Sequence, residues 1–277
     1  MTAVWGWTFV LVKDAITQYP TLAFLQLRFV LAALVMVILV HRLPTRRELW
    51  TGAVAGAILA GGYLFQTVGL ETTSPGNAGL ITGLFVVFTP LIDRVFGVAV
   101  HRRTVVALLV ALAGTVMLTG GLGGMGLGDA LVLVCAVLYG LHIVVLSRWS
   151  PGLRAAPLAM VQMVTCAVIF SIGGTPELKS LPSPSVWFAI AITGVFASAL
   201  AFYLQTWAQA HIDASRTALI LATEPAWALV ASVVLAGQRL DAVQAAGAGL
   251  VLVAIVGHEL VPLLGRNARK NRIGSSP

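Results

Sequence analysis

Three ionisable side chains inside long apolar segments are the first candidates for chemistry in this 277-residue chain, and the first of them is Glu224. Glu224 is the only carboxylate well inside such a segment, and the neighbouring Pro225 removes a backbone donor and frees carbonyl groups nearby. In hydrocarbon, an ionisable group must face the interior of a helix bundle or water. Glu224 is therefore either a proton- or cation-responsive group at a central cavity or a structural acid bonded to a neighbouring helix.

Arg28 and His142 also lie inside apolar segments. Arg28 binds a substrate carboxylate, pairs with an acid, or holds helices together through its five N–H donors, and we favour the structural role. His142 follows Tyr139 by three residues, so the two share one face of a helix. His142 either relays protons or donates to a substrate, or it is a packing residue, which is the commoner role of a lone histidine on an apolar helix.

Amides and aromatic rings supply the remaining candidates. In the run from Gly52 to Gln66, small residues recur near helical spacing and give way to polar ones. Such a stripe packs helices together, and we expect its polar part, near the middle of the membrane, to line a cavity. Aromatic rings at that depth contact a substrate by stacking or by cation–π attraction. The predicted substrate-binding residues are Trp5, Tyr63, Gln66, Asn77, Tyr139, His142, Tyr203, Gln205 and Trp227.

The sequence contains no motif of the common enzyme or cofactor sites. It has no phosphate-binding P-loop, no His-Glu-x-x-His pattern or Cys/His cluster for zinc, and no Gly-x-Ser-x-Gly elbow. We therefore expect no enzyme activity, no cofactor and no metal.

Composition indicates which elements position these side chains. Hydrophobic residues make up 58% of the chain and charged residues 10%, and mean hydropathy is +0.95. A soluble domain carries about 25% charged residues, and a membrane-spanning helix needs roughly 20 apolar residues. The sequence predicts an all-α polytopic membrane protein with ten transmembrane helices, at residues 2–18, 20–40, 49–70, 75–97, 104–121, 126–147, 156–174, 185–208, 214–235 and 242–263.

The basic residues predict the orientation of these helices. With the N-terminus in the cytoplasm, 13 of the 17 Lys and Arg residues fall in inner loops and the tail, three fall in outer loops, and Arg28 lies inside a span. This asymmetry indicates a plasma (inner) membrane protein with both termini cytoplasmic. The net charge of +7 is scattered over short loops, so we expect no nucleic-acid partner. Residues 264–277 form a basic cytoplasmic tail that contacts lipid headgroups.

The chain also contains an internal repeat. Residues 63–67 and 202–206 are similar, and each is followed by a turn, a new helix and a mid-span proline. We divide the chain into a first repeat, residues 1–121, and a second, residues 126–263, with five helices each. An odd number of spans places the repeats in inverted orientations, an architecture that holds substrate near the midplane where the halves meet. Trp5 matches Tyr139 but has fewer residues before it, so the first span is either short or begins upstream.

Several short motifs are spread along both halves of the chain: Trp5-Gly6-Trp7-Thr8-Phe9, Lys13, Leu27-Arg28-Phe29, the run from Gly69 to Pro90, Thr223-Glu224-Pro225 and Gly237-Gln238-Arg239-Leu240. With the ten spans and two halves, they resemble the EamA type of the drug/metabolite transporter (DMT) superfamily over nearly the whole chain. The resemblance implies export or exchange of small organic solutes, commonly coupled to ion gradients, through a cavity lined by spans 1, 3, 4, 6, 8 and 9. The family often has Gly-Glu near the end of span 9, where this chain has Gly237-Gln238, so no coupling role passes to that position.

We therefore expect a secondary active transporter that exports a small metabolite by alternating access, coupled through Glu224 to protons or another ion. Two other classes remain open. An integral membrane enzyme acting on lipid would need a catalytic cluster at one membrane face, and a membrane scaffold or sensor would carry no solute flux. The expected partners are a small-molecule substrate and the lipid bilayer, and a homodimer is an open alternative to a monomer.

Overall fold

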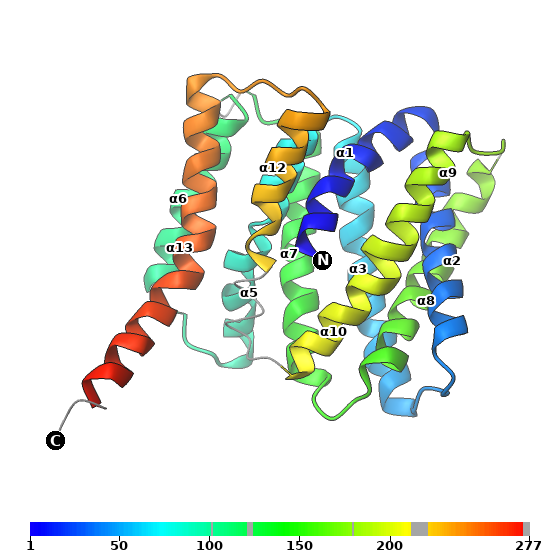
Figure 1. The fold of residues 1–277 in the computed structure, drawn as a ribbon, viewed down its shortest axis with the longest axis horizontal. Coiled ribbons are helices and arrows are strands. Elements are labelled where there is room, and N and C mark those ends of the chain that lie inside the picture. The colour runs from blue at the N-terminus through cyan, green and yellow to red at the C-terminus, as the bar shows by residue number, and fades with distance from the viewer. Residues whose placement is uncertain (101, 121–123, 179, 212–220, 274–277) are drawn as a thin grey trace.

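The structure, a computed structural model of the full chain, is a bundle of helices of very different lengths (Figure 1). It describes the backbone except at residues 101, 121–123, 179, 212–220 and 274–277, and it describes side chains up to residue 257. Within that part of the chain all regular structure is helical, which confirms the prediction of an all-α protein. The predicted basic tail, residues 264–277, lies outside the described side chains.

The first half of the chain contains six α-helices and a short 3-10 turn. Four of the α-helices coincide with the predicted spans to within a few residues, and the fourth predicted span, 75–97, is divided between α4 and α5. The elements are α1 (Thr2–Gln18), α2 (Thr21–Leu39), α3 (Arg46–Leu70), α4 (Pro75–Thr82), α5 (Phe85–Asp93), η1 (Arg94–Phe96) and α6 (Arg102–Leu118).

The second half shows the same order with one further interruption. The predicted span 185–208 is a continuous helical rod, but its middle third is a π-helix, η3. The start of the predicted span 214–235 falls within residues 212–220, outside the described residues. The elements are α7 (Leu127–Trp149), α8 (Ala155–Gly174), η2 (Thr175–Glu177), α9 (Pro184–Ala191), η3 (Ile192–Leu200), α10 (Ala201–His211), α12 (Glu224–Leu235) and α13 (Ala242–Ile273).

Length and apolar composition make six of the described helical segments able to cross a membrane. Two shorter apolar helices, Glu224–Leu235 and Ala242–Gly257, accompany them. Hydrocarbon offers backbone groups no hydrogen-bond partner, so an apolar chain crosses it as a helix, which bonds its own backbone. The six segments are Thr21–Leu39, Arg46–Leu70, Pro75–Phe96, Leu127–Trp149, Ala155–Glu177 and Pro184–His211.

Serine-proline pairs begin two of the interrupted helices. The hydroxyl of Ser74 accepts the backbone N–H of Asn77 at 3.2 Å, and Pro75 occupies the first turn of α4. Ser183 caps α9 in the same way through the N–H of Val186, at 3.4 Å. Proline at this point needs no intrahelical donor, and the serine oxygen satisfies one of the free N–H groups.

Glycine allows the helices of the two halves to cross in close contact. At Gly79 of α4, a Cβ atom would lie 2.1 Å from the Cβ of Ala228 in α12. Gly114 of α6 and Gly247 of α13 approach reciprocally, and a Cβ on either would lie within 2.7 Å of the other's carbonyl oxygen. Side chains larger than hydrogen would force these helices apart, so the crossings depend on glycine.

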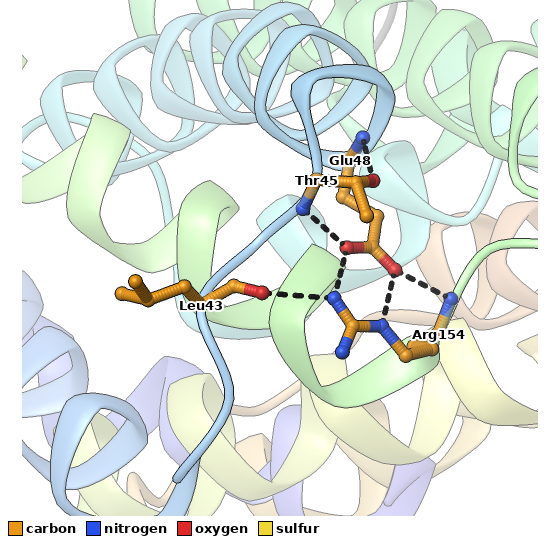
Figure 2. Close-up of polar contacts among 4 residues, drawn as sticks. All are labelled: Leu43, Thr45, Glu48 and Arg154. Carbon is orange, nitrogen blue, oxygen red and sulfur yellow. Dashed lines mark hydrogen bonds and ion pairs between the residues drawn. The ribbon is translucent and has the colours of Figure 1, made fainter.

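A buried carboxylate joins two loops at one end of the bundle (Figure 2). Glu48 forms a capping box with Thr45, and its carboxylate also accepts the Nε and Nη2 of Arg154 at 2.8 and 2.6 Å. The Nη2 of Arg154 also donates to the carbonyl oxygen of Leu43 at 2.9 Å. The hydrogen bond to Glu48 raises the pKa of the Arg154 guanidinium, so the pair remains charged. The contact fixes the α2–α3 loop to the start of α8.

Candidate functional site

A central cavity of about 50 Å³ lies among helices from both halves of the chain. This volume holds a few water molecules, so a larger solute requires the surrounding helices to move apart. The walls come from α1, α2, α3, α5, α7, α10 and α12. The described residues that line it are Trp5, Thr8, Phe9, Val12, Arg28, Leu59, Tyr63, Gln66, Leu70, Phe85, Tyr139, His142, Ile143, Phe202, Gln205, Leu221 and Glu224.

Arg28 brings a buried positive charge to this cavity from α2. Its side chain is 3% exposed, and its Nε donates to the hydroxyl of Ser198 in the π-helix at 3.0 Å. The guanidinium carbon lies 4.4 Å from the centre of the Tyr63 ring, a cation–π contact. No carboxylate of the described residues lies within ion-pair distance of Arg28.

Glu224 brings a buried carboxyl group to the same cavity from the first turn of α12. It is 5% exposed and has no hydrogen bond or ion pair with any other described residue. Glu224 and Arg28 therefore face one space without neutralising each other directly.

Hydrogen bonds fix the polar side chains on the α7 wall. The Nε2 of His142 lies 2.8 Å from the Oε1 of Gln162, whose amide nitrogen bonds to the carbonyl oxygen of Leu158 and to the hydroxyl of Thr206. Since that amide nitrogen already donates twice, Oε1 is the acceptor and His142 donates from Nε2. This network holds the imidazole ring in place against α8 and α10.

Gln66 and Tyr139 form a second polar pair. The hydroxyl of Tyr139 donates to the Oε1 of Gln66 at 3.4 Å, and the Nε2 of Gln66 donates to the hydroxyl of Thr82 at 3.3 Å. Gln205, on the opposite half, is 3% exposed and has no hydrogen bond with another described residue. Its amide is therefore available to a ligand.

Aromatic rings surround these polar groups. The ring centroids of Trp5 and Phe202 are 5.4 Å apart, and Tyr63 contacts Tyr139 and Phe202 edge to face at 5.7 and 6.0 Å. The indole N–H of Trp5 donates to the carbonyl oxygen of Ala197 at 2.7 Å, within the π-helix. Trp5 is therefore both a wall of the cavity and an anchor between α1 and η3.

Eight of the eleven residues singled out in the sequence line this cavity: Trp5, Arg28, Tyr63, Gln66, Tyr139, His142, Gln205 and Glu224. Asn77, Tyr203 and Trp227 are not among its lining residues. The side-chain oxygen of Asn77 accepts from Gln238 at 3.5 Å, and Trp227 is 42% exposed. Their proposed contact with substrate, like that of the other eight, is a prediction.

Sequence reasoning missed several apolar members of the wall. Phe202, adjacent to Tyr203, faces the cavity, and it lies three residues before Gln205 just as Tyr63 lies three before Gln66. Exact alignment of the two repeats would have selected Phe202. Phe85 and Phe9 gave no such signal, because an apolar ring in an apolar helix does not show which way it faces.

The described residues contain no group of three or more His, Cys, Asp or Glu side chains that could hold a metal ion. Arg28 and Glu224, with the amides and aromatic rings, could instead bind an organic solute through charge, hydrogen bonds and stacking. A helical membrane protein with such a cavity at the meeting of two halves has the form of a small-solute carrier.

Comparison with known proteins identifies the class. The model of the EamA-like transporter family matches residues 1–120 and again residues 126–258. The chain therefore belongs to the EamA-like transporter family, and it is a multi-pass membrane transporter.

Similar proteins carry matching names. The chain is 33% identical over 259 residues to an "Uncharacterized transporter" of Archaeoglobus fulgidus, covering 91% of this chain and 81% of the relative. It is 25% identical over 263 residues to the "Uncharacterized inner membrane transporter YedA" of Escherichia coli K12, covering 91% and 86%. A crystal structure with a TM-score of 0.71 and 22% identity covers 96% of both chains and shows the same fold.

Proposed function

We propose that this protein is a secondary active transporter that exports a small organic solute across the plasma membrane by alternating access. The observation that carries the proposal is the pair of buried ionisable residues, Arg28 and Glu224, which face one central cavity without an ion-pair partner among the described residues. Isolated charges in a membrane protein are costly and mark pathways for ions or substrates. A purely structural pair would be in direct contact.

The packing of the helices supports two inverted repeats of five spans. We divide them as residues 1–121 and 126–263, with residues 264–277 as a cytoplasmic tail and both termini in the cytoplasm. Equivalent elements of the two halves pack on each other, as α2 does on α8, α4 on α12 and α6 on α13. Contacts between elements that are not equivalent also occur in pairs. In one such pair α1 packs on α12, and the elements equivalent to these in the other half, α7 and α5, pack on each other as well. This exchange symmetry is what two interconverting halves require.

Polar contacts close the bundle near both ends of the cavity. At one end Arg148 of α7 pairs with Asp93 of α5 at 2.7 Å. At the other end the Nζ of Lys13 in α1 donates to the carbonyl oxygens of Leu70 and Glu71, at 2.5 and 3.0 Å. In an alternating-access cycle these contacts break in turn, because each joins two helices that line the cavity.

Coupling through Glu224 is tested in proteoliposomes with a solute identified by screening. Glu224→Gln keeps the shape of the side chain and removes its charge, so we expect it to abolish uptake driven by a pH gradient. Solute counterflow, which needs no net proton movement, should persist in the same vesicles. Asp14→Asn is the matched control, because Asp14 is exposed and outside the cavity, and it should leave both activities unchanged. Normal pH-driven uptake by Glu224→Gln would refute the coupling role, and no flux of any solute by the wild type would refute transport.

A further inference from the structure

The helical rod formed by α9, η3 and α10 changes its hydrogen-bond pattern in the middle (Figure 1). In an α-helix the carbonyl oxygen of Ala197 would accept the backbone N–H of Ala201. Here that N–H bonds to the carbonyl oxygens of Phe196 and Ser198. The carbonyl oxygen of Ala197 accepts the indole N–H of Trp5 at 2.7 Å. The side chain of Trp5 thus occupies an acceptor that the α-helical form of this segment needs.

The backbone on either side of η3 already has α-helical dihedral angles. Ala191 and Ile192 have φ and ψ of −63°, −51° and −62°, −48°, and Ala201 has −65°, −44°, close to the α-helical values of about −63° and −42°. A π-turn contains one residue more than an α-turn, because its hydrogen bonds reach five residues rather than four. Conversion of η3 to α-helix therefore needs an exchange of hydrogen-bond partners rather than a break in the helix.

The upstream part of the rod is the more firmly held. η3 packs on α1 and α2, and at Gly194 a Cβ atom would lie 2.9 Å from a backbone oxygen of α2. α10 packs on α8 and α7. Its hydrogen bonds to them join Thr206 with Gln162 and Gln209 with Ser147, both at 3.4 Å, longer than the usual range of about 2.7–3.2 Å. α10 is therefore the part that turns.

Conversion changes which side chains of α10 face the cavity. A step of one residue is about 100° of helix rotation. With the upstream part fixed, conversion of one π-turn carries each side chain of α10 onward by one such step. Ala201 then takes the place of Phe202, and Leu204 that of Gln205.

The ring of Phe202 occupies the cavity in the present form. It is 4% exposed and contacts three other rings of the cavity wall at centroid distances of 5.4–6.0 Å. The cavity beside it measures about 50 Å³. Exchange of a phenyl ring for the methyl group of Ala201 therefore enlarges the space available to a solute.

We propose that η3 is a register switch, whose π form holds the ring of Phe202 in the cavity and whose α form turns that ring away and presents Ala201. Trp5 and Arg28 line the cavity and bond to adjacent residues of η3, so a change in the cavity reaches the switch directly. The inference rests on the proposed function in one respect, that the cavity must widen to admit a solute.

Thiol modification at adjacent positions of α10 tests the rotation without any solute. Leu204→Cys and Gln205→Cys are made separately in the full-length protein, reconstituted in lipid vesicles and treated with 2-aminoethyl methanethiosulfonate. The reagent attacks thiolates in water, so it reacts faster at whichever position faces the cavity. Leu204 is 39% exposed on the outside of the bundle, and Gln205 lines the cavity. The wild type is the blank, because Cys135 and Cys166 are buried.

Trp5→Phe removes the indole donor and destabilises the π form relative to the α form. The ratio of the Leu204→Cys rate to the Gln205→Cys rate follows the ratio of the two forms. We expect that ratio to rise roughly threefold or more, the effect of one lost hydrogen bond. Trp7→Phe, at an exposed position of the same helix, is the matched control and should leave it unchanged. General loosening raises both rates together, so an unchanged or lower ratio in Trp5→Phe would overturn the inference.

Deletion of Val195 tests the register itself and decides the matter if Trp5→Phe does not fold. Removal of one residue lets η3 close as an α-helix while α10 keeps its present orientation. The rate ratio should be lower in this background than with η3 intact, and Trp5→Phe should no longer change it. A ratio that is equal or higher after the deletion would refute the switch.

These measurements need no flux, which separates the inference from the proposed function. The expected rate ratios in a protein that shows no counterflow of any solute would refute transport and leave the switch intact. Counterflow at the wild-type rate after deletion of Val195 would refute the switch and leave transport intact.

Discussion

The crossing of α4 and α12 gives a sharp prediction, because it depends on the absence of one methyl group. In Gly79→Ala, the new Cβ would lie 2.1 Å from the Cβ of Ala228, whereas non-bonded carbons pack at about 3.5–4.0 Å. Neither atom can rotate away, since both are fixed to helix backbone. The two helices must therefore separate by about 1.5 Å or more at the crossing.

The magnitude follows from two opposing effects. Overpacking a close contact destabilises by about 1–3 kcal/mol, and a rigid overlap of this size belongs at the upper end. Replacing glycine by alanine within a helix contributes up to about 1 kcal/mol in the opposite direction. We expect Gly79→Ala to lose about 2 kcal/mol of stability and to reduce solute counterflow, because the crossing joins the two halves.

A reciprocal exchange and a matched control make this prediction decisive. Gly79→Ala combined with Ala228→Gly moves the methyl group from one helix to the other, so stability and flux should return close to wild type. Gly249→Ala in α13 adds a methyl where no atom lies within 4 Å and should be neutral or slightly stabilising. The assay is thermal unfolding in detergent with counterflow in liposomes. An unchanged melting temperature in Gly79→Ala, or a double variant no better than the single one, would refute the reasoning.

Three further substitutions test contacts at the edges of the cavity and the bundle. Trp5→Phe removes the indole donor to Ala197 and leaves a buried carbonyl without its partner, so thermal unfolding should show a loss of about 1–3 kcal/mol; no loss would mean that the anchor is dispensable. Asp93→Asn weakens a partly exposed ion pair with Arg148 and should reduce the free energy of unfolding by about 0.2–1 kcal/mol, and by less in high salt, which screens the pair. Glu48→Gln should lower the melting temperature more than Asp93→Asn does, because the Glu48 carboxylate is buried and accepts several bonds; the reverse order would contradict this account.

The sequence predicted the helices well because a backbone in hydrocarbon must satisfy its own hydrogen bonds, and a helix does so within one segment. Eight of the ten predicted spans match described helical segments to within three residues at each end, and the helix of the tenth, α13, continues beyond the predicted end. It did not predict the interruptions. The break between α4 and α5 comes at Gly83, seven residues before the mid-span Pro90, and Pro90 itself lies inside α5. The π-helix at Ile192–Leu200 has no signature in composition.

The sequence predicted the ionisable residues of the candidate site, which are rare in apolar helices, and missed its apolar residues, which are common there. Glu224, Arg28 and His142 stand out in any apolar segment, and all three line the cavity. Tyr203 and Phe202 are adjacent aromatic residues, and about 100° of helix rotation separates them. Which of the two faces the cavity depends on how α10 packs against its neighbours, and that information is not local.

The sequence by itself determined that the chain is a helical membrane protein and which few ionisable side chains its interior must accommodate. These follow from composition and from the cost of polar groups in hydrocarbon, which act on each segment independently. Tertiary structure alone decided that Arg28 and Glu224 face one cavity without an ion-pair partner among the described residues, that Tyr63 and Ser198 contact the guanidinium, and that Asn77 and Trp227 lie elsewhere. These arrangements depend on the rotation and separation of helices distant in the chain, and close packing at residues such as Gly79 sets both.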